Sequence, residues 1–252
     1  KDANGRNTSI AQDENALELA EDYLKVDIQW IKAQLKEYTE ENRPFSVEIY
    51  PNGLCVIQSG FIHESLEQQQ EIALKMIRLA SDEKQLKTIV VPKGGHEGFF
   101  RVRKYIVLAW LDGGKAIAGI LNTDQDIVDD ESQSNVDDQS QEAPFEDPQL
   151  ETFVKENGVL LHLNIGSVWY SKRLEQERQR IALQIMSEHV HTKKDDSEPQ
   201  IPLPSKEKLL CLFCGIGPFP LVLLKKAKKY IQHVHAVELN PSSYHYAQRN
   251  IQ

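Results

Sequence analysis

Apolar and polar positions repeat with two different periods along the first third of the chain. Between residues 15 and 38, and again between residues 64 and 80, apolar side chains recur every three or four positions, which predicts two amphipathic helices. The segments 45–50 and 54–59 alternate in the manner of strands. Because the pair Asn52-Gly53 lies between these segments, and Asn-Gly favours a tight turn, we predict a β-hairpin here.

Strand patterns continue beyond the second helix. Residues 88–91 and 105–110 are short apolar runs, and the glycine-rich segment 94–101 separates them. Residues 159–165 predict another strand, and a helix rich in Arg and Gln is predicted over residues 174–187. The pattern therefore indicates the α/β class for this part of the chain and does not name a particular fold.

Two polar segments divide the chain. Residues 112–150 contain eleven acidic residues against the single Lys115, with few large apolar residues, so we expect a disordered acidic insert. This segment accounts for the net charge of −9, and the near-neutral remainder neither requires nor excludes a nucleic-acid partner. A proline-containing linker is expected over residues 193–207. The predicted parts of the chain are thus residues 1–111, 112–150, 151–192, 193–207 and 208–252.

Composition excludes several protein classes. No apolar run approaches the roughly 20 residues of a membrane-spanning helix, and the first residues do not resemble a signal peptide. The cysteines, Cys55, Cys211 and Cys214, are too few for a disulfide framework, so we expect a reducing, intracellular compartment. Cytoplasm, nucleus and mitochondrial matrix all fit. Cys211 and Cys214 are spaced as C-x-x-C, but without a second pair we expect no metal site.

The segment after the predicted linker carries the most informative motif. Residues 209–213 form an apolar run of the length of a buried parallel strand, which leads directly into Gly215 and Gly217. A helix over residues 221–229 and a second buried strand over residues 234–237 follow. This order is that of the first βαβ unit of a nucleotide-binding sheet, so we predict the start of a Rossmann-like domain after the α/β N-terminal domain.

An acid and a missing glycine indicate the ligand of this unit. Glu238 ends the second strand, where it is placed to accept hydrogen bonds from both hydroxyls of a ribose. Dinucleotide-binding turns carry a third glycine where this chain has Pro220, and the shorter turn suits S-adenosylmethionine, which has no pyrophosphate. The alternative is a glycine turn in an ordinary α/β core. The expected cofactor contacts are Phe213, Cys214, Gly215, Gly217, Pro218, Glu238, Leu239 and Asn240.

Several segments together resemble one enzyme family. Residues 212–219 and 238–241 resemble the cofactor motifs of the archaeal and eukaryotic tRNA (guanine-37, N1) methyltransferases, which are class I S-adenosylmethionine-dependent methyltransferases. Residues 156–158 and 168–178 resemble that family's segment ending in Arg-Leu-x-x-Glu-Arg, and residues 100–103 resemble its Phe-Arg element. The combination is more specific than the cofactor motif alone, which many methyltransferases share.

The resemblance implies methyl transfer from S-adenosylmethionine to N1 of guanine 37 in tRNA. Guanine N1 carries a proton, so the reaction needs a base to remove it and a cation to stabilise the charge that grows on O6. By the matching motifs Glu177 is the base and Arg101 is the cation. The alternative for Glu177 is an exposed helix carboxylate paired with Arg173 or Arg180.

The resemblance also implies RNA as the partner. It covers residues 86–111 and 151–252, and the first eighty residues have no counterpart, although residues 1–111 remain a candidate RNA-binding domain. No membrane and no metal are expected as partners. The expected RNA contacts are Trp169, Tyr170, Lys172, Arg173 and Arg178.

Three positions depart from the family pattern. Cys211 replaces the acid that opens the glycine motif, Trp169 replaces a tyrosine, and Lys172 replaces a proline. They fit a second hypothesis, an inactive methyltransferase relative that binds RNA or serves as a structural subunit in ribosome assembly or another larger RNA–protein assembly. A third candidate is the related aminocarboxypropyltransferase of wybutosine synthesis, but Pro218 and Leu239 stand where that enzyme typically has Tyr and Trp. Only two of the five or more parallel strands of a doubly wound sheet are predicted, so we expect part of a longer methyltransferase.

Overall fold

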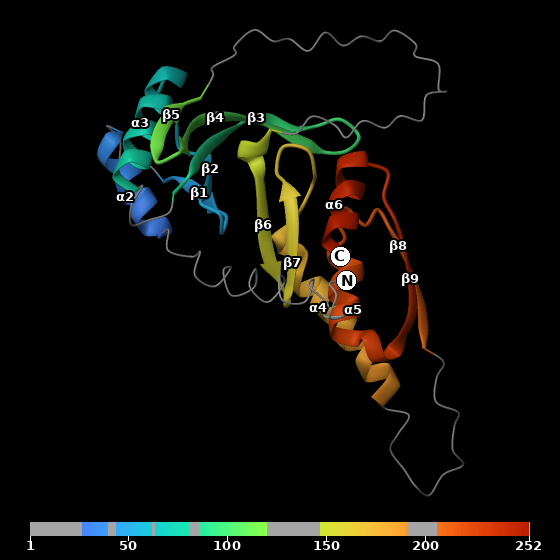
Figure 1. Ribbon diagram of the computed structural model, residues 1–252. Coiled ribbons are helices and arrows are strands. Elements are labelled where there is room, and N and C mark those ends of the chain that lie inside the picture. The colour runs from blue at the N-terminus through green and yellow to red at the C-terminus, as the bar shows by residue number, and fades with distance from the viewer. Residues whose placement is uncertain are drawn as a thin grey trace, which may run out of the picture. The chain divides into compact units, whose positions relative to one another are not determined.

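A computed structural model describes residues 27–39, 44–61, 64–80, 86–119, 147–190 and 206–251 of the chain. The chain divides into two compact units. We call them the N-terminal unit, with Asp22–Gly95 and Arg103–Leu150, and the C-terminal unit, with His96–Val102 and Glu151–Gln252. Each unit combines helices and strands, which confirms the predicted α/β class (Figure 1).

The N-terminal unit is built on a five-stranded sheet with the strand order β1-β2-β3-β4-β5. β1 is antiparallel to β2, β2 is parallel to β3, and β4 is antiparallel to β5. The turn between β1 and β2 contains Gly53 at a φ of 86°, a conformation that glycine adopts without strain, and the predicted hairpin is confirmed. The strands are β1 (Ser46–Ile49), β2 (Leu54–Ser59), β3 (Thr88–Glu97), β4 (Val102–Asp112) and β5 (Lys115–Ala118).

Two helices, α2 (Ile28–Tyr38) and α3 (Leu66–Ala80), cover one face of this sheet (Figure 1). The Asp27 carboxylate caps α2 by accepting from the Gln29 N–H at 2.8 Å, and Ser65 and Gln68 form a reciprocal capping box at the start of α3. The part of the first predicted helix before residue 27 lies outside the described residues. Both helices share a core with alternate strand residues, which includes Ile31, Leu35, Cys55, Ile57, Met76, Ile77, Ile89 and Val91.

Two sequence predictions about this unit are wrong at their boundaries. β3 continues through residues 94–97, the first half of the segment that was expected to separate the two strands, and the turn occupies only residues 98–101. The expected insert, residues 112–150, contains ordered structure at both ends, namely β5 and the 3-10 helix η1 (Pro148–Leu150). β5 can form because the Gly113-Gly114 pair, with positive φ angles of 53° and 80°, makes a tight turn after β4 and lets the chain pair with it as an antiparallel strand. Residues 120–146 lie outside the described residues.

The C-terminal unit begins with an antiparallel hairpin of β6 (Glu151–Glu156) and β7 (Val159–Asn164). Only β7 was predicted from the pattern. The turn residues Asn157 and Gly158 both have positive φ, 52° and 80°, which is the Asn-Gly turn that favours hairpins. The short 3-10 helix η2 (Lys172–Leu174) and helix α4 (Glu175–Val190) follow, close to the predicted helix.

The predicted βαβ unit is confirmed. β8 (Glu207–Leu212) is parallel to β9 (Ile231–Val237), and α5 (Pro218–Ala227) and the 3-10 helix η4 (Lys228–Tyr230) connect them. A final helix, α6 (Pro241–Ile251), follows β9. β8 starts at Glu207, one residue inside the predicted linker, and residues 191–205 lie outside the described residues.

The two parallel strands are less buried than predicted. One face packs on α4 and α5 through a core that includes Ile185 and Leu223. On the other face Leu210, Leu212 and Val237 are 65%, 56% and 51% exposed. The prediction of strands buried on both faces is therefore wrong for the described residues, because the helices described here cover only one side.

Candidate functional site

The glycine turn links the end of β8 to the start of α5. Phe213, Gly215 and Gly217 all have positive φ, at 55°, 57° and 90°, so the chain reverses within five residues. Gly217 is the N-cap of α5, and Pro218 follows at the first helical position, where a missing N–H costs no hydrogen bond. The Cys214 N–H donates to the carbonyl of Val237 at 3.0 Å, which fixes the turn beside the end of β9.

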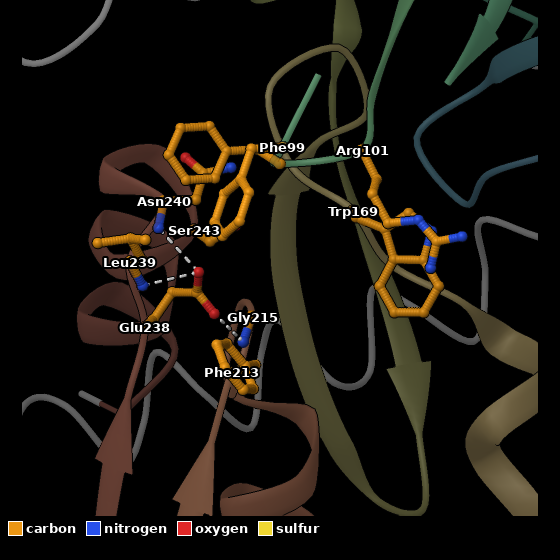
Figure 2. A pocket seen from close by; sticks show the side chains of 10 residues that line it. Phe99, Arg101, Trp169, Phe213, Gly215, Glu238, Leu239, Asn240 and Ser243 are labelled. Atoms are coloured by element: carbon orange, nitrogen blue, oxygen red, sulfur yellow. Dashed lines mark hydrogen bonds between the residues drawn. The ribbon is translucent and has the colours of Figure 1, made fainter. Parts of the chain in front are cut away.

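The Glu238 carboxylate joins the ends of the two parallel strands. Its Oε2 accepts from the Gly215 N–H at 2.7 Å, and its Oε1 accepts from the N–H groups of Leu239 at 2.9 Å and Asn240 at 2.8 Å (Figure 2). Hydrogen bonds from N–H groups to an ionised acceptor are stronger than neutral ones. The acid predicted to bind ribose is therefore held in place by three backbone groups.

Two asparagines tie this region to the β7 segment: Asn240, one of the expected cofactor contacts, and Asn250, which the sequence analysis did not select. The Asn240 side chain caps α6 by accepting from the Ser242 N–H at 3.0 Å and donates to the Ser167 carbonyl at 3.1 Å. The Asn250 amide donates to the carbonyls of Ile216 at 3.0 Å and His162 at 3.1 Å, and its oxygen accepts from the His162 N–H at 2.8 Å. Asn250 thus joins α6, β7 and the glycine turn, a role that only the fold reveals.

A pocket of about 280 Å³ opens beside the glycine turn, and all of its lining residues belong to the C-terminal unit. Three expected cofactor contacts, Cys214, Gly217 and Pro218, are buried and do not line it. The lining combines expected residues with three that were not selected, Phe99, Phe100 and Ser243. It consists of Phe99, Phe100, Arg101, Trp169, Phe213, Gly215, Glu238, Leu239, Asn240 and Ser243.

The two ends of the pocket differ in chemistry (Figure 2). Backbone N–H groups and the Glu238 carboxylate form one end, which we call the polar end. The other, the aromatic end, contains the Arg101 guanidinium 6.0 Å from the centre of the Trp169 ring. The Phe99 ring, in edge contact with the Phe100 ring at 5.7 Å, lies beside Asn240 and Ser243. A guanidinium over an indole is a favourable cation–π arrangement.

Only one of the two arginines in the Phe-Arg element reaches this pocket. Arg101 lies in the turn between β3 and β4 with a φ of 55° and lines the pocket. Arg103 donates instead to the Gln58 side chain at 2.6 Å and to the Gly94 carbonyl at 3.3 Å, both in the N-terminal unit. Of these two arginines, Arg101, the residue that the resemblance indicated, lines the pocket.

Glu177, the candidate base, does not line this pocket. It lies in the first turn of α4, where its two carboxylate oxygens accept from Arg180 at 2.7 and 2.8 Å. The hydrogen bonds and charge of Arg180 lower the pKa of Glu177 below its ordinary value. The structure therefore shows the arrangement considered as the alternative for this residue, a helix carboxylate paired with Arg180.

One of the five expected RNA contacts, Arg178, is wrong because its side chain is buried. Arg178 is only 2% exposed, and its guanidinium donates to the buried Glu156 carboxylate, so it cannot reach a phosphate. The Tyr170 hydroxyl donates to the same carboxylate at 2.7 Å. Lys172 and Arg173 are exposed on η2, and Trp169 lines the pocket, so these three side chains remain accessible.

The cysteines are free thiols in this structure. Burial raises the pKa of Cys214 to about 11, and that of Cys211 also rises with burial, so both are neutral at physiological pH.

Within the described residues, no three His, Cys, Asp or Glu side chains are grouped as metal ligands. Those residues also contain no helix with the length and apolar character needed to cross a membrane.

Curated proteins related to the chain share part of its sequence. The tRNA (guanine(37)-N(1))/4-demethylwyosine(37)-methyltransferase Taw22 of Nanoarchaeum equitans is 33% identical over 97 residues, 38% of this chain and 26% of that protein. The tRNA (guanine(37)-N(1))-methyltransferase of Paramecium tetraurelia is 34% identical over 116 residues, 42% of this chain and 24% of that protein. The tRNA(Phe) (4-demethylwyosine(37)-C(7)) aminocarboxypropyltransferase of Methanocaldococcus jannaschii is 32% identical over 103 residues, which are 41% of this chain and 33% of that protein.

A solved complex of aTrm5 and tRNALeu matches with a TM-score of 0.49 and 21% identity, over 86% of this chain and 45% of that one. No model of a known protein family matches the chain. The matched regions span about a quarter to a third of the three curated relatives. Over about two fifths of its length, the chain is therefore similar to tRNA (guanine-37, N1) methyltransferases, the family that its glycine turn and its Arg-Leu-x-x-Glu-Arg segment resemble.

Proposed function

We propose that the protein transfers a methyl group from S-adenosylmethionine to N1 of guanine 37 in tRNA. One observation carries this proposal: a single pocket is lined by the glycine turn with Glu238 and by Arg101, whose guanidinium lies over the Trp169 indole. The first arrangement suits the cofactor and the second suits a guanine base. The relatives named above are enzymes of this reaction or of a closely related one.

The residues of the polar end fit S-adenosylmethionine. A carboxylate offers about four acceptor positions, and three of those on Glu238 are used by backbone N–H groups, so one ribose hydroxyl can bind directly. A side chain at Gly215 would occupy pocket space, since a Cβ there has only the Trp169 carbonyl within 4 Å, at 3.8 Å. Phe213 and Leu239 are 78% and 62% exposed on the pocket lining, which suits them to enclose an adenine ring.

The residues of the aromatic end fit guanine. Trp169 presents a flat surface on which a base can stack, and base–aromatic stacking contributes about 1–3 kcal/mol. Arg101 can donate hydrogen bonds to guanine O6, and its fixed charge stabilises the negative charge that develops there. Bound S-adenosylmethionine supplies an electrophilic methyl group, so the methyl acceptor must lie between the two ends of the pocket.

Proton removal is the step for which the protein must provide a base. The N1–methyl bond forms as the methyl–sulfur bond breaks, and the N1 proton passes to a carboxylate. We assign this role to Glu177, which must then release Arg180 and turn toward the base. The lowered pKa of Glu177 makes it a weaker base while Arg180 is bound, so binding of RNA is expected to separate the pair.

A second function is favoured by Cys211, which stands where the family pattern that the chain resembles has an acid. Its neutral thiol cannot bind a charged amino group as a carboxylate does. If this change lowers the affinity for S-adenosylmethionine so far that the site stays empty, the protein is an RNA-binding subunit of a larger RNA–protein assembly. Restoring the acid with Cys211→Asp should then restore cofactor binding.

Methyl transfer by the full-length protein distinguishes these functions. With guanine-37 tRNA and labelled S-adenosylmethionine, the wild type should form N1-methylguanine, and Glu177→Gln should lower the rate by about 10²–10⁴ while tRNA binding is retained. Arg101→Ala should lower the rate by about 10². Glu188→Gln, a carboxylate change farther along α4, is the matched control and should leave the rate unaltered.

Three results would contradict the proposal. RNA binding without any transfer by the wild type favours the structural subunit. Transfer of the aminocarboxypropyl group rather than methyl favours the wybutosine reaction. Full activity of Glu177→Gln removes that residue from the chemistry and leaves the proton to another base.

A further inference from the structure

A buried ion pair in the C-terminal unit takes no part in the proposed chemistry. Arg178 on α4 and Glu156 at the end of β6 are 2% and 1% exposed. Two guanidinium nitrogens donate to the carboxylate, Nε to one oxygen and Nη2 to the other at 2.6 Å. Nη2 also donates to the Ser171 carbonyl at 3.0 Å. This bidentate geometry fixes the guanidinium in both position and orientation.

The contacts of this pair join segments that are far apart in the sequence. The Tyr170 hydroxyl donates to Glu156 at 2.7 Å, and the guanidinium carbon of Arg178 lies 5.7 Å from the Tyr170 ring centre and 5.6 Å from that of Phe219. Phe219 is in the first turn of α5, directly after the glycine turn. Tyr170 directly follows Trp169, which lines the pocket. Arg178 therefore contacts a residue next to each end of the pocket.

Stability alone does not account for charges in this position. Removing two charges from water is costly, and an apolar cluster of similar volume often stabilises a fold as well or better. Burial, helped by the hydrogen bond to Glu156, raises the pKa of Tyr170, so its hydroxyl stays protonated and donates at neutral pH. The network is thus complete under physiological conditions, and its directional bonds restrict how Tyr170 and the residue before it can lie.

We propose that Arg178 is a positioning residue which, through Glu156 and Tyr170, holds the Trp169 indole in place relative to the glycine turn. This inference rests on the proposed function, because Trp169 is the surface on which guanine is proposed to stack. Misplacement of a reacting group by 1 Å can lower a rate by about 100-fold. Release of Trp169 should therefore lower kcat, whereas the cofactor contacts of Glu238 should be unaffected.

Two variants separate positioning from folding. Tyr170→Phe deletes the single hydroxyl that bonds Glu156 and keeps the ring beside Arg178. The double variant Arg178→Met with Glu156→Leu removes both charges, so neither is left buried and unpaired. The matched control is Arg249→Met with Glu151→Leu, which removes an exposed ion pair of the same unit, with side chains 46% and 39% exposed.

Each variant is made in the full-length protein with every tryptophan other than Trp169 replaced by phenylalanine, including Trp30 and Trp110. Acrylamide quenching of Trp169 fluorescence should then rise about twofold in Tyr170→Phe and further in the double variant. In the methylation assay kcat should fall about tenfold or more, while the KM for S-adenosylmethionine stays within twofold. The control pair should change neither quantity.

The proposal is overturned if both variants melt as the parent does and leave Trp169 quenching and kcat unaltered. If the double variant does not fold, Tyr170→Phe decides alone, because it removes one oxygen and leaves the ion pair intact. If the parent protein transfers no methyl group, the proposed function fails, and the quenching measurement still shows whether Arg178 and Tyr170 position Trp169.

Discussion

The polar and aromatic ends of the pocket are built in different ways. At the polar end the groups proposed to bind the ligand are held by the backbone: Glu238 accepts hydrogen bonds from three backbone N–H groups, and Gly215 and Gly217 set the path of the chain. At the aromatic end the groups are the exposed side chains of Arg101 and Trp169, which come from separate segments of the chain. The first end is thus set by one continuous βαβ segment, and the second depends on packing elsewhere in the unit.

This difference has a functional consequence. Groups held by backbone hydrogen bonds keep their geometry when a distant side chain changes, whereas side chains that rest on one another move together. We therefore expect cofactor binding to be insensitive to substitutions at the aromatic end. RNA binding and turnover should respond to those substitutions strongly.

The largest effect of this kind is expected for Trp169→Ala. Loss of the stacking surface should weaken binding of guanine-37 tRNA by about 1–3 kcal/mol, while affinity for S-adenosylmethionine is retained. Lys172→Ala is an informative control, because the loss of a phosphate contact should reduce the slope of log affinity against log salt concentration by about one. Trp169→Ala should leave this slope unaltered. Equal losses of cofactor and RNA affinity in Trp169→Ala would show that the two ends are not independent.

A smaller effect is expected for Arg180→Gln. Because Arg180 lowers the pKa of Glu177, its removal should raise that pKa toward the ordinary value. A base acts in its ionised form, and the pH profile of kcat/KM reports the free enzyme, in which Arg180 is paired with Glu177. The rising limb of that profile should therefore move to higher pH by the same amount. Carboxyl titration by NMR gives the pKa change directly, and Arg249→Gln serves as control. A shifted Glu177 titration with an unshifted rate profile would exclude Glu177 as the base.

The same contrast explains what the sequence could predict. The βαβ unit was predictable because strand, glycine turn, helix, strand and acid lie within one short segment and each has a local signature. β6 was missed although Asn157-Gly158 marks a hairpin turn, because two of the three residues on its buried face, Thr152 and Glu156, are polar and interrupt the apolar alternation of a strand. β5 was missed because its four residues were assigned to the acidic segment, despite the Gly113-Gly114 turn before it.

Roles that depend on tertiary contacts could not be predicted. Arg178 has the appearance of a surface arginine in the sequence, and only the fold shows that Glu156, 22 residues earlier, buries it. Asn250 contacts His162 from 88 residues away. No local pattern encodes such pairings, because each depends on how β6, β7 and α6 pack.

The central claim is that the polar end binds S-adenosylmethionine through Glu238. Isothermal titration calorimetry on the full-length protein tests it directly, with Glu238→Ala compared with the wild type. Loss of the charged hydrogen bond should weaken binding by about 1.5–3 kcal/mol, roughly a tenfold to 150-fold rise in Kd. Gln248→Ala, an exposed position on α6, is the control and should bind as the wild type does. Wild-type affinity in Glu238→Ala, or no binding by the wild type, would contradict the assignment of this pocket to the cofactor.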